Sequence, residues 1–77
     1  MANAMTTALE LVGRLDRAAR FNPFTGVALE TQTAHLSDAD REAWRELRRN
    51  VDTYRINGEE AEAAVTAMEA RLAAAAT

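Results

Sequence analysis

Apolar residues recur at intervals of three and four in three separate segments of this 77-residue chain. The three sets are Ala8, Val12, Leu15 and Ala19; Trp44, Leu47, Val51 and Tyr54; and Ala61, Val65, Met68, Leu72 and Ala75. This spacing places each set on one face of an α-helix. The pattern therefore predicts an all-α fold, either a small three-helix bundle or a helical hairpin with a packed N-terminal helix.

The predicted helices cover about residues 7–20, 38–56 and 59–75 of a single helical domain, residues 1–77. Thr6 or Thr7 is suited to cap the first helix, and Ser37 is suited to cap the second. We expect Asn57-Gly58 to end the second helix as a left-handed C-cap, because glycine adopts that conformation without strain.

The connection between the first two helices is the least regular part of the sequence. Asn22-Pro23 ends the first helix, because the residue before a proline avoids the helical region. We expect Phe21 and Phe24, on either side of this turn, to close one end of the core, and Leu9 to widen the apolar face of the first helix. Residues 27–35 fit either an extended strap or a short helical turn.

The apolar inventory is small for a domain that folds alone. A core of this size supplies about 3–5 kcal/mol, and small scaffolds commonly add disulfides, a metal or oligomerisation. The chain has no cysteine and one histidine, so disulfides are excluded and a histidine-built metal site is not expected. We therefore expect a homo-oligomer or a partner protein to supply additional stability.

The sequence carries no sign of a membrane or secretory protein. No apolar run approaches the roughly 20 residues that span a bilayer, and residues 1–15 lack the basic start of a secretory signal. The absence of cysteine is consistent with a reducing compartment. We expect a cytoplasmic protein with no membrane partner.

All nine basic residues are arginines, and five of them fall on the second predicted helix. Helical spacing gathers four of these arginines into a band beside a tryptophan. Guanidinium groups bind carboxylates, phosphates and aromatic faces, and arginine and tryptophan are enriched in interface hot spots. The candidate partner-binding residues are therefore Arg41, Trp44, Arg45, Arg48 and Arg55. The alternatives are a solvated helix face for the arginines and a core position for the tryptophan.

No arrangement in the sequence supports catalysis or a cofactor. The sequence pairs His35 with no identifiable catalytic nucleophile. Ser37 and Asp38 lie close to it in the chain, but they are better explained as the N-terminus of a helix. No phosphate loop, dinucleotide fingerprint or zinc pattern occurs. We expect no catalytic, cofactor-binding or metal-binding residues, and hence a protein that is not an enzyme.

A helix-turn-helix DNA reader is the main nucleic-acid alternative, because the last two predicted helices have suitable lengths. In that motif the N-terminal residues of the second helix enter the major groove, and here they would be Glu59, Glu60 and Glu62. Their carboxylates would repel phosphates, and a net charge of −3 differs from the basic footprint of nucleic-acid binders. Direct binding of nucleic acid is not expected, and a small DNA-associated transcriptional regulator using the arginine band stays open as an alternative.

At the level of class, the chain resembles the small, cysteine-free, mildly acidic helical proteins that phages encode as inhibitors of host machinery, anti-CRISPR proteins among them. The resemblance covers the whole chain and rests on size, composition and helix content, without a shared motif. It implies a non-catalytic phage or mobile-element inhibitor that sterically blocks a host protein complex, such as one that binds nucleic acid. The resemblance does not assign a functional role to any individual residue. A phage assembly adaptor is the other protein-binding alternative.

Overall fold

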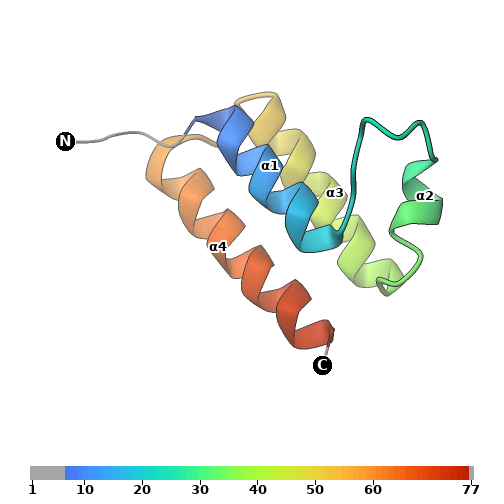
Figure 1. The fold of residues 1–77 in the computed structure, drawn as a ribbon. Coiled ribbons are helices and arrows are strands. Elements are labelled where there is room, and N and C mark those ends of the chain that lie inside the picture. The colour runs from blue at the N-terminus through green and yellow to red at the C-terminus, as the bar shows by residue number, and fades with distance from the viewer. Residues whose placement is uncertain (1–6, 77) are drawn as a thin grey trace.

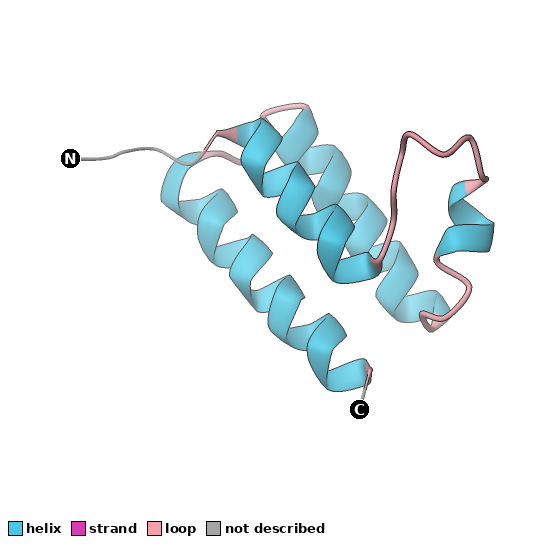
Figure 2. Ribbon diagram, viewed as in Figure 1, coloured by secondary structure: helices cyan, strands magenta, loops and turns pink. Residues whose placement is uncertain are grey.

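Four helices and no strand make up the part of the chain that the structure describes, residues 7–76. They are α1 (Ala8–Ala19), α2 (Leu29–Gln32), α3 (Asp38–Asp52) and α4 (Gly58–Ala75). In this computed structural model α1, α3 and α4 pack on one another as a bundle, with α3 antiparallel to the other two (Figure 1). The single turn of α2 belongs to the connection between α1 and α3 (Figure 2). The predicted all-α fold is confirmed.

The N-termini of α1 and α3 begin at the residues that the sequence indicated. Thr7 Oγ1 accepts a hydrogen bond from the backbone amide of Glu10. The Glu10 carboxylate accepts one from the backbone amide of Thr7, which completes a capping box. The bonds from Thr7 lower the pKa of Glu10, because they favour its charged form. Ser37 Oγ accepts the amide of Asp40 in the same way at the start of α3.

The predicted end of the second helix is wrong, because α3 ends at Asp52 and not near Ile56. Asn57 and Gly58 do not cap it. Asn57 is instead the N-cap residue of α4, and Gly58 begins α4 with a left-handed φ of 58°. The pair therefore forms the entry into the next helix.

The chain leaves α3 through Tyr54, whose φ of 62° lies in the left-handed region. The Tyr54 amide donates to the Val51 carbonyl and the Arg55 amide donates to the Asn50 carbonyl. This is the hydrogen-bond pattern of a Schellman motif, with tyrosine in the place that glycine usually takes. Because the backbone turns there, Tyr54 leaves the apolar seam predicted for it and is 68% exposed.

The core lies between the three long helices and contains most of the predicted seam positions. Its buried apolar residues are Leu11, Val12, Leu15, Ala19, Leu36, Trp44, Val51, Ala61, Val65, Met68 and Leu72. Leu9 is an exception to the prediction, because 83% of its surface is exposed. Residues 27–35 contain the helical turn of α2, which was one of the two alternatives for this segment.

One arginine joins each pair of long helices. The pairs between the long helices are Arg14 with Glu69 and Glu62 (α1 to α4), Arg48 with Asp16 (α3 to α1) and Arg71 with Asp40 (α4 to α3). Each long helix therefore contributes one guanidinium, and α4 contributes two carboxylates where α1 and α3 contribute one each. The planar guanidinium suits such pairs, because it donates two hydrogen bonds in a fixed geometry.

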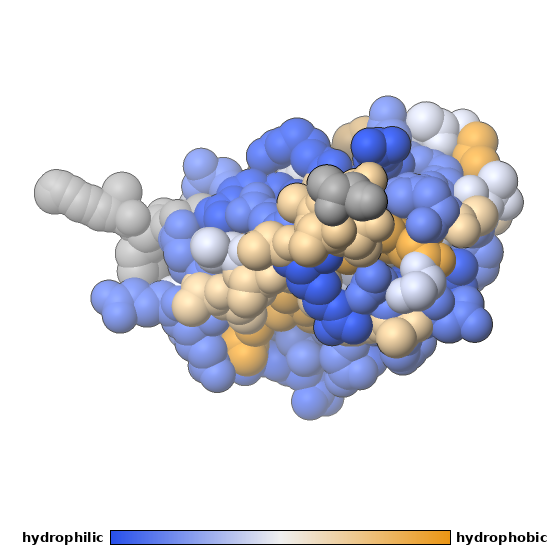
Figure 3. Space-filling view, turned by 90° about the horizontal axis from the view of Figure 1, so that it is seen from below, coloured by the Kyte–Doolittle hydropathy of each residue, from blue (hydrophilic) through white to orange (hydrophobic). Residues whose placement is uncertain are grey.

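α4 is apolar on two opposite faces. Its core face is covered by α1 and α3, whereas Ala63, Ala67, Ala70 and Ala74 are exposed at helical spacing on the outer face. Figure 3 shows a mildly hydrophobic band along this side of the molecule. Alanine is the strongest helix former, so it supports a long helix whose Asn57 N-cap makes no side-chain hydrogen bond. Within residues 7–76, no helix has the length and apolar character required to cross a membrane.

The ion pair between α1 and α4 makes stability depend on pH. The hydrogen bonds from Arg14 lower the pKa of Glu69 below its ordinary value. A carboxylate with a lowered folded-state pKa stabilises the fold above its unfolded pKa, about 4.3, and this stabilisation is lost as the pH falls through the folded pKa. We expect Glu69→Gln to be less stable than wild type at pH 7 and to lose less stability on acidification. Urea unfolding at pH 7 and pH 3 measures both.

Glu42→Gln is the matched control, because Glu42 is exposed on α3 away from this pair. Its stability should follow the wild-type pH dependence. An acid-induced loss in Glu69→Gln as large as that of the wild type would contradict the role assigned to the Arg14–Glu69 pair.

Candidate protein-binding surface

Trp44, the aromatic member of the predicted binding band, is fully buried. Its Nε1–H donates to the Leu15 carbonyl at 2.8 Å. The Phe21 ring meets it edge-on, with ring centroids 5.6 Å apart. Trp44 therefore lies in the core, which was the alternative to a position on a binding surface. Its contacts fix how α3 packs against the C-terminal part of α1.

Arg48 is also engaged within the chain. Its guanidinium donates to both carboxylate oxygens of the buried Asp16, at 2.6 and 3.0 Å, and this pairing raises the pKa of Arg48. The same group lies 5.4 Å from the Phe21 ring centroid and 6.0 Å from that of Trp44, within cation–π range. Arg48 neutralises a buried charge, which is a structural role.

Arg41 and Arg45 hold the segment that precedes α3. Arg41 donates to the carbonyls of Thr33 and Leu36, at 3.4 and 3.5 Å. Arg45 contacts Glu30 of α2 at 3.5 Å, and both of these side chains are substantially exposed. Arg45 therefore combines a weak internal contact with an accessible guanidinium.

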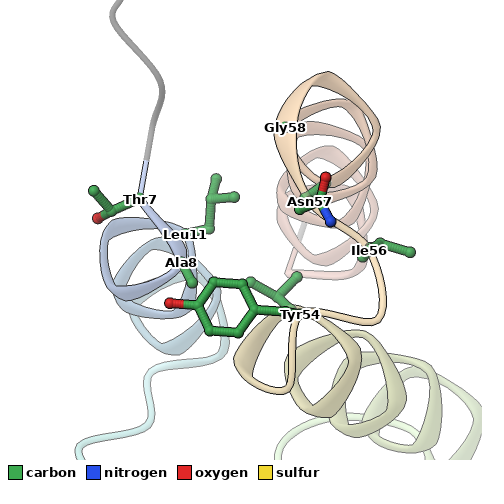
Figure 4. Close-up of a pocket in the computed structure, with 9 residues that line it drawn as sticks. Thr7, Ala8, Leu11, Tyr54, Ile56, Asn57 and Gly58 are labelled. Atoms are coloured by element: carbon green, nitrogen blue, oxygen red, sulfur yellow. The ribbon is translucent and has the colours of Figure 1, made fainter.

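Arg55 lies on the exposed turn between α3 and α4, outside the helix whose spacing placed it in the band. The neighbouring Tyr54 lines a pocket of about 240 Å³ at this end of the bundle. Figure 4 shows the Tyr54 ring beside Ala8 and Leu11 of α1. The five predicted residues are thus divided: Trp44 lies in the core and Arg55 on this turn, whereas Arg41, Arg45 and Arg48 make contacts within the chain. Arg45 and Arg48 line one hollow together.

A different candidate is the loop of residues 20–28, between α1 and α2. The Gln32 side-chain amide donates to the carbonyls of Asn22 and Val27 and to Thr25 Oγ1, each at 3.0 Å. Its oxygen accepts the Asn22 amide at 2.8 Å. Asn22 Oδ1 in turn accepts the Phe24 amide. One glutamine therefore ties both ends of the loop together.

This hydrogen-bonded loop exposes Phe24. The ring is 93% exposed, so the prediction that Phe24 closes the core is wrong. Phe21 packs against the core instead, with its ring on Trp44. A large apolar side chain on a loop that is already ordered loses little conformational entropy on binding. Phe24 therefore has the features of a recognition residue.

Phe24 lines a groove of about 610 Å³, which we call the Phe24 groove. The α1 residues that line it are Leu9, Val12, Gly13, Asp16 and Arg17, and the loop and α3 contribute Phe21, Asn22, Pro23, Phe24, Arg48 and Asp52. The α1 residues lie at helical spacing and form one side of the helix. The two most exposed large hydrophobic residues in the described part of the chain, Leu9 and Phe24, both line this groove.

A second hollow, which we call the arginine hollow, adjoins the Phe24 groove. It is lined by Leu29, Arg45, Arg48, Arg49 and Asp52, two of which line the groove as well. The linings together hold four arginines and two aspartates. Arg45 and Arg49 also contact the exposed carboxylates of Glu30 and Glu46, at 3.5 and 3.7 Å, so charges of both signs surround the groove.

Leu9 and Phe24 were not predicted as binding residues, because large apolar residues are expected in the core. The exposure of Leu9 could have been predicted from its position on the helix. At about 100° per residue, Leu9 lies about 90° from the centre of the stripe formed by Ala8, Val12, Leu15 and Ala19. No comparable signal existed for Phe24, whose exposure depends on contacts across the loop.

Residues 7–76 contain no group of three histidine, aspartate or glutamate side chains placed to hold a metal ion. Comparison with protein-family models, with curated proteins and with solved structures finds no match for this chain. The Phe24 groove and the arginine hollow are therefore the features of the molecule from which we infer a function.

The contacts of the arginine band predict different effects for two charge reversals. Arg48→Glu places a second carboxylate beside the buried Asp16, and we expect it to lower the free energy of unfolding by about 3 kcal/mol. Arg45→Glu disrupts only an exposed contact with Glu30, and we expect a change below about 1 kcal/mol. Urea unfolding followed by circular dichroism measures both. Equal effects of the two substitutions would contradict the structural role of Arg48.

Proposed function

We propose that this protein is a non-catalytic protein-binding module whose contact surface is the Phe24 groove with the adjoining arginine hollow. The observation that carries the proposal is the 93% exposed Phe24 on a loop that Gln32 holds in place. Aromatic and arginine side chains are enriched among interface hot spots. Full burial of an exposed phenylalanine side chain stabilises a complex by about 1.5–3 kcal/mol before the costs of association.

We further propose that the module acts by steric blocking, as a phage or mobile-element inhibitor of a host protein complex in the cytoplasm, of the anti-CRISPR kind. Small size, the lack of cysteine and mild acidity support this class. A fixed loop with an exposed aromatic ring is suited to occupying a partner surface without any chemical step. Arg45 stays a candidate for contacts beside the groove, because it is exposed and lines the arginine hollow. Arg55 is exposed on the turn between α3 and α4 and stays a candidate there.

A tagged pull-down from nuclease-treated bacterial lysate, read by mass spectrometry, tests the binding function. We expect the wild type to capture one stoichiometric protein, and Phe24→Ser to lose it while keeping its helical circular dichroism spectrum, because Phe24 contributes little to the core. Tyr54→Ser is the matched control, since it removes an exposed aromatic ring at a different pocket. It should retain the partner.

Capture that is unaffected by Phe24→Ser and lost in Tyr54→Ser would move the binding surface to the end of the bundle and contradict the proposal. Recovery of this protein alone would favour the homo-oligomer expected from the small core. Light scattering would then give a multiple of the 8.4 kDa chain mass.

A further inference from the structure

Asn57 and Gly58 form an asparagine–glycine pair at the entry into α4. Both residues line the pocket at this end of the bundle, and Figure 4 shows them where α4 begins. Glycine has no Cβ, so its backbone nitrogen is open to close approach by other groups. An asparagine side chain directly before it can therefore reach that nitrogen, and the pair has a chemistry that depends on how its two amides are held.

The Asn57 side chain is exposed, and it forms no hydrogen bond within residues 7–76. An N-cap asparagine usually accepts a hydrogen bond from the second or third backbone amide of its helix, which holds the side chain over the helix end. That bond is absent at the start of α4. The side-chain amide of Asn57 is therefore able to rotate toward the backbone.

The Gly58 amide is the backbone group next to this side chain. It is the first amide of α4, and the first amides of a helix have no carbonyl partner within it. It donates no hydrogen bond within the described residues. A Cβ built on Gly58 would meet nothing within 4 Å, so the space around this peptide group is open to water.

The other asparagines in residues 7–76 are held differently. Asn50 lies inside α3, where the next amide belongs to the helix and carries the β-branched side chain of Val51. Asn22 precedes Pro23, whose nitrogen has no hydrogen, and its Oδ1 accepts the Phe24 amide. The chain therefore contains its own comparison for the asparagine–glycine pair.

We propose that Asn57 is a site of spontaneous deamidation. The Gly58 nitrogen attacks Cγ of Asn57 and loses its proton, a cyclic succinimide forms, and the side-chain nitrogen leaves as ammonia. Water then adds to one of the two ring carbonyls and opens the ring, which leaves aspartate or isoaspartate at position 57. The reaction consumes one water and releases one ammonia, without oxidation or reduction. No enzyme is required.

The two products differ in their effect on α4. Aspartate is as good an N-cap residue as asparagine. In isoaspartate the former side-chain carbonyl is joined to Gly58, so the main chain contains one additional carbon. The Asn57 carbonyl accepts the Ala61 amide at 3.3 Å, and Ala61 is fully buried in the core. Isoaspartate removes this carbonyl from the first turn, and we expect it to weaken the packing of α4.

The test follows the full-length protein during incubation in mildly alkaline buffer, in which a backbone amide loses its proton more readily. Trypsin places the described asparagines in separate peptides, residues 21–41, 50–55 and 56–71. By mass spectrometry, we expect the 56–71 peptide to change from the amide to the acid at least about tenfold faster than the 50–55 peptide, because α3 must open before Asn50 reacts. Isoaspartate methyltransferase should label the 56–71 peptide and neither of the other two.

Asn57→Ser is the matched control, because serine is a good N-cap residue and has no amide. Its 56–71 peptide should keep its mass, and its melting temperature should be the same before and after incubation. The isoaspartate form of the wild type, purified after incubation, should melt about 4–8 °C below the fresh protein, because the first turn of α4 has lost a hydrogen bond.

A 56–71 peptide that keeps its mass would overturn the inference, and so would equal rates in the 56–71 and 50–55 peptides. Conversion to aspartate without isoaspartate would also overturn it, because direct hydrolysis of the side chain forms no ring. An isoaspartate form that melts at the temperature of the fresh protein would contradict the role assigned to the Asn57 carbonyl in holding α4.

Discussion

The hydrogen bond from the Trp44 indole to the Leu15 carbonyl is the contact on which the bundle and the groove both depend. It joins α3 to α1 inside the core, where a buried indole N–H without a partner would cost about 1–3 kcal/mol. The Phe21 ring packs edge-on against the same indole, and Arg48 lies over both rings while it neutralises Asp16. These contacts fix the position of Phe21, which is the first residue after the left-handed end of α1.

The position of Phe21 determines where the loop that carries Phe24 begins. The other end of the loop is held by α2, whose Gln32 side chain bonds to the loop backbone. α2 contacts α3 through the exposed Arg45–Glu30 pair, and Arg41 donates a hydrogen bond to the carbonyl of Thr33. Arginines that the sequence indicated as an interface therefore support, within the chain, the loop that exposes the recognition residue. The exposed Phe24 ring is a feature that folding alone does not require.

Local signals in the sequence were sufficient to predict the helices and most of the core. The start of α1 at Thr7 and of α3 at Ser37 follows from capping within four residues, and the seam of Val65, Met68 and Leu72 follows from helical period. The end of α3 could not be predicted in this way, because Tyr54 adopts a conformation in which glycine is expected. The candidate site could not be predicted from local signals either, because it depends on contacts between residues far apart in the sequence. The Arg48–Asp16 pair spans 32 residues, and the bonds from Gln32 to Asn22 span 10.

The function proposed for Phe24 requires an ordered loop, because a recognition residue on a fixed loop differs physically from a phenylalanine on a mobile one. Backbone ¹⁵N relaxation of residues 22–27 measures that order directly. The hydrogen bonds made by Gln32 predict order parameters of about 0.85, equal to those of α1 and α3. Values below about 0.6 across the loop would contradict a preformed recognition surface.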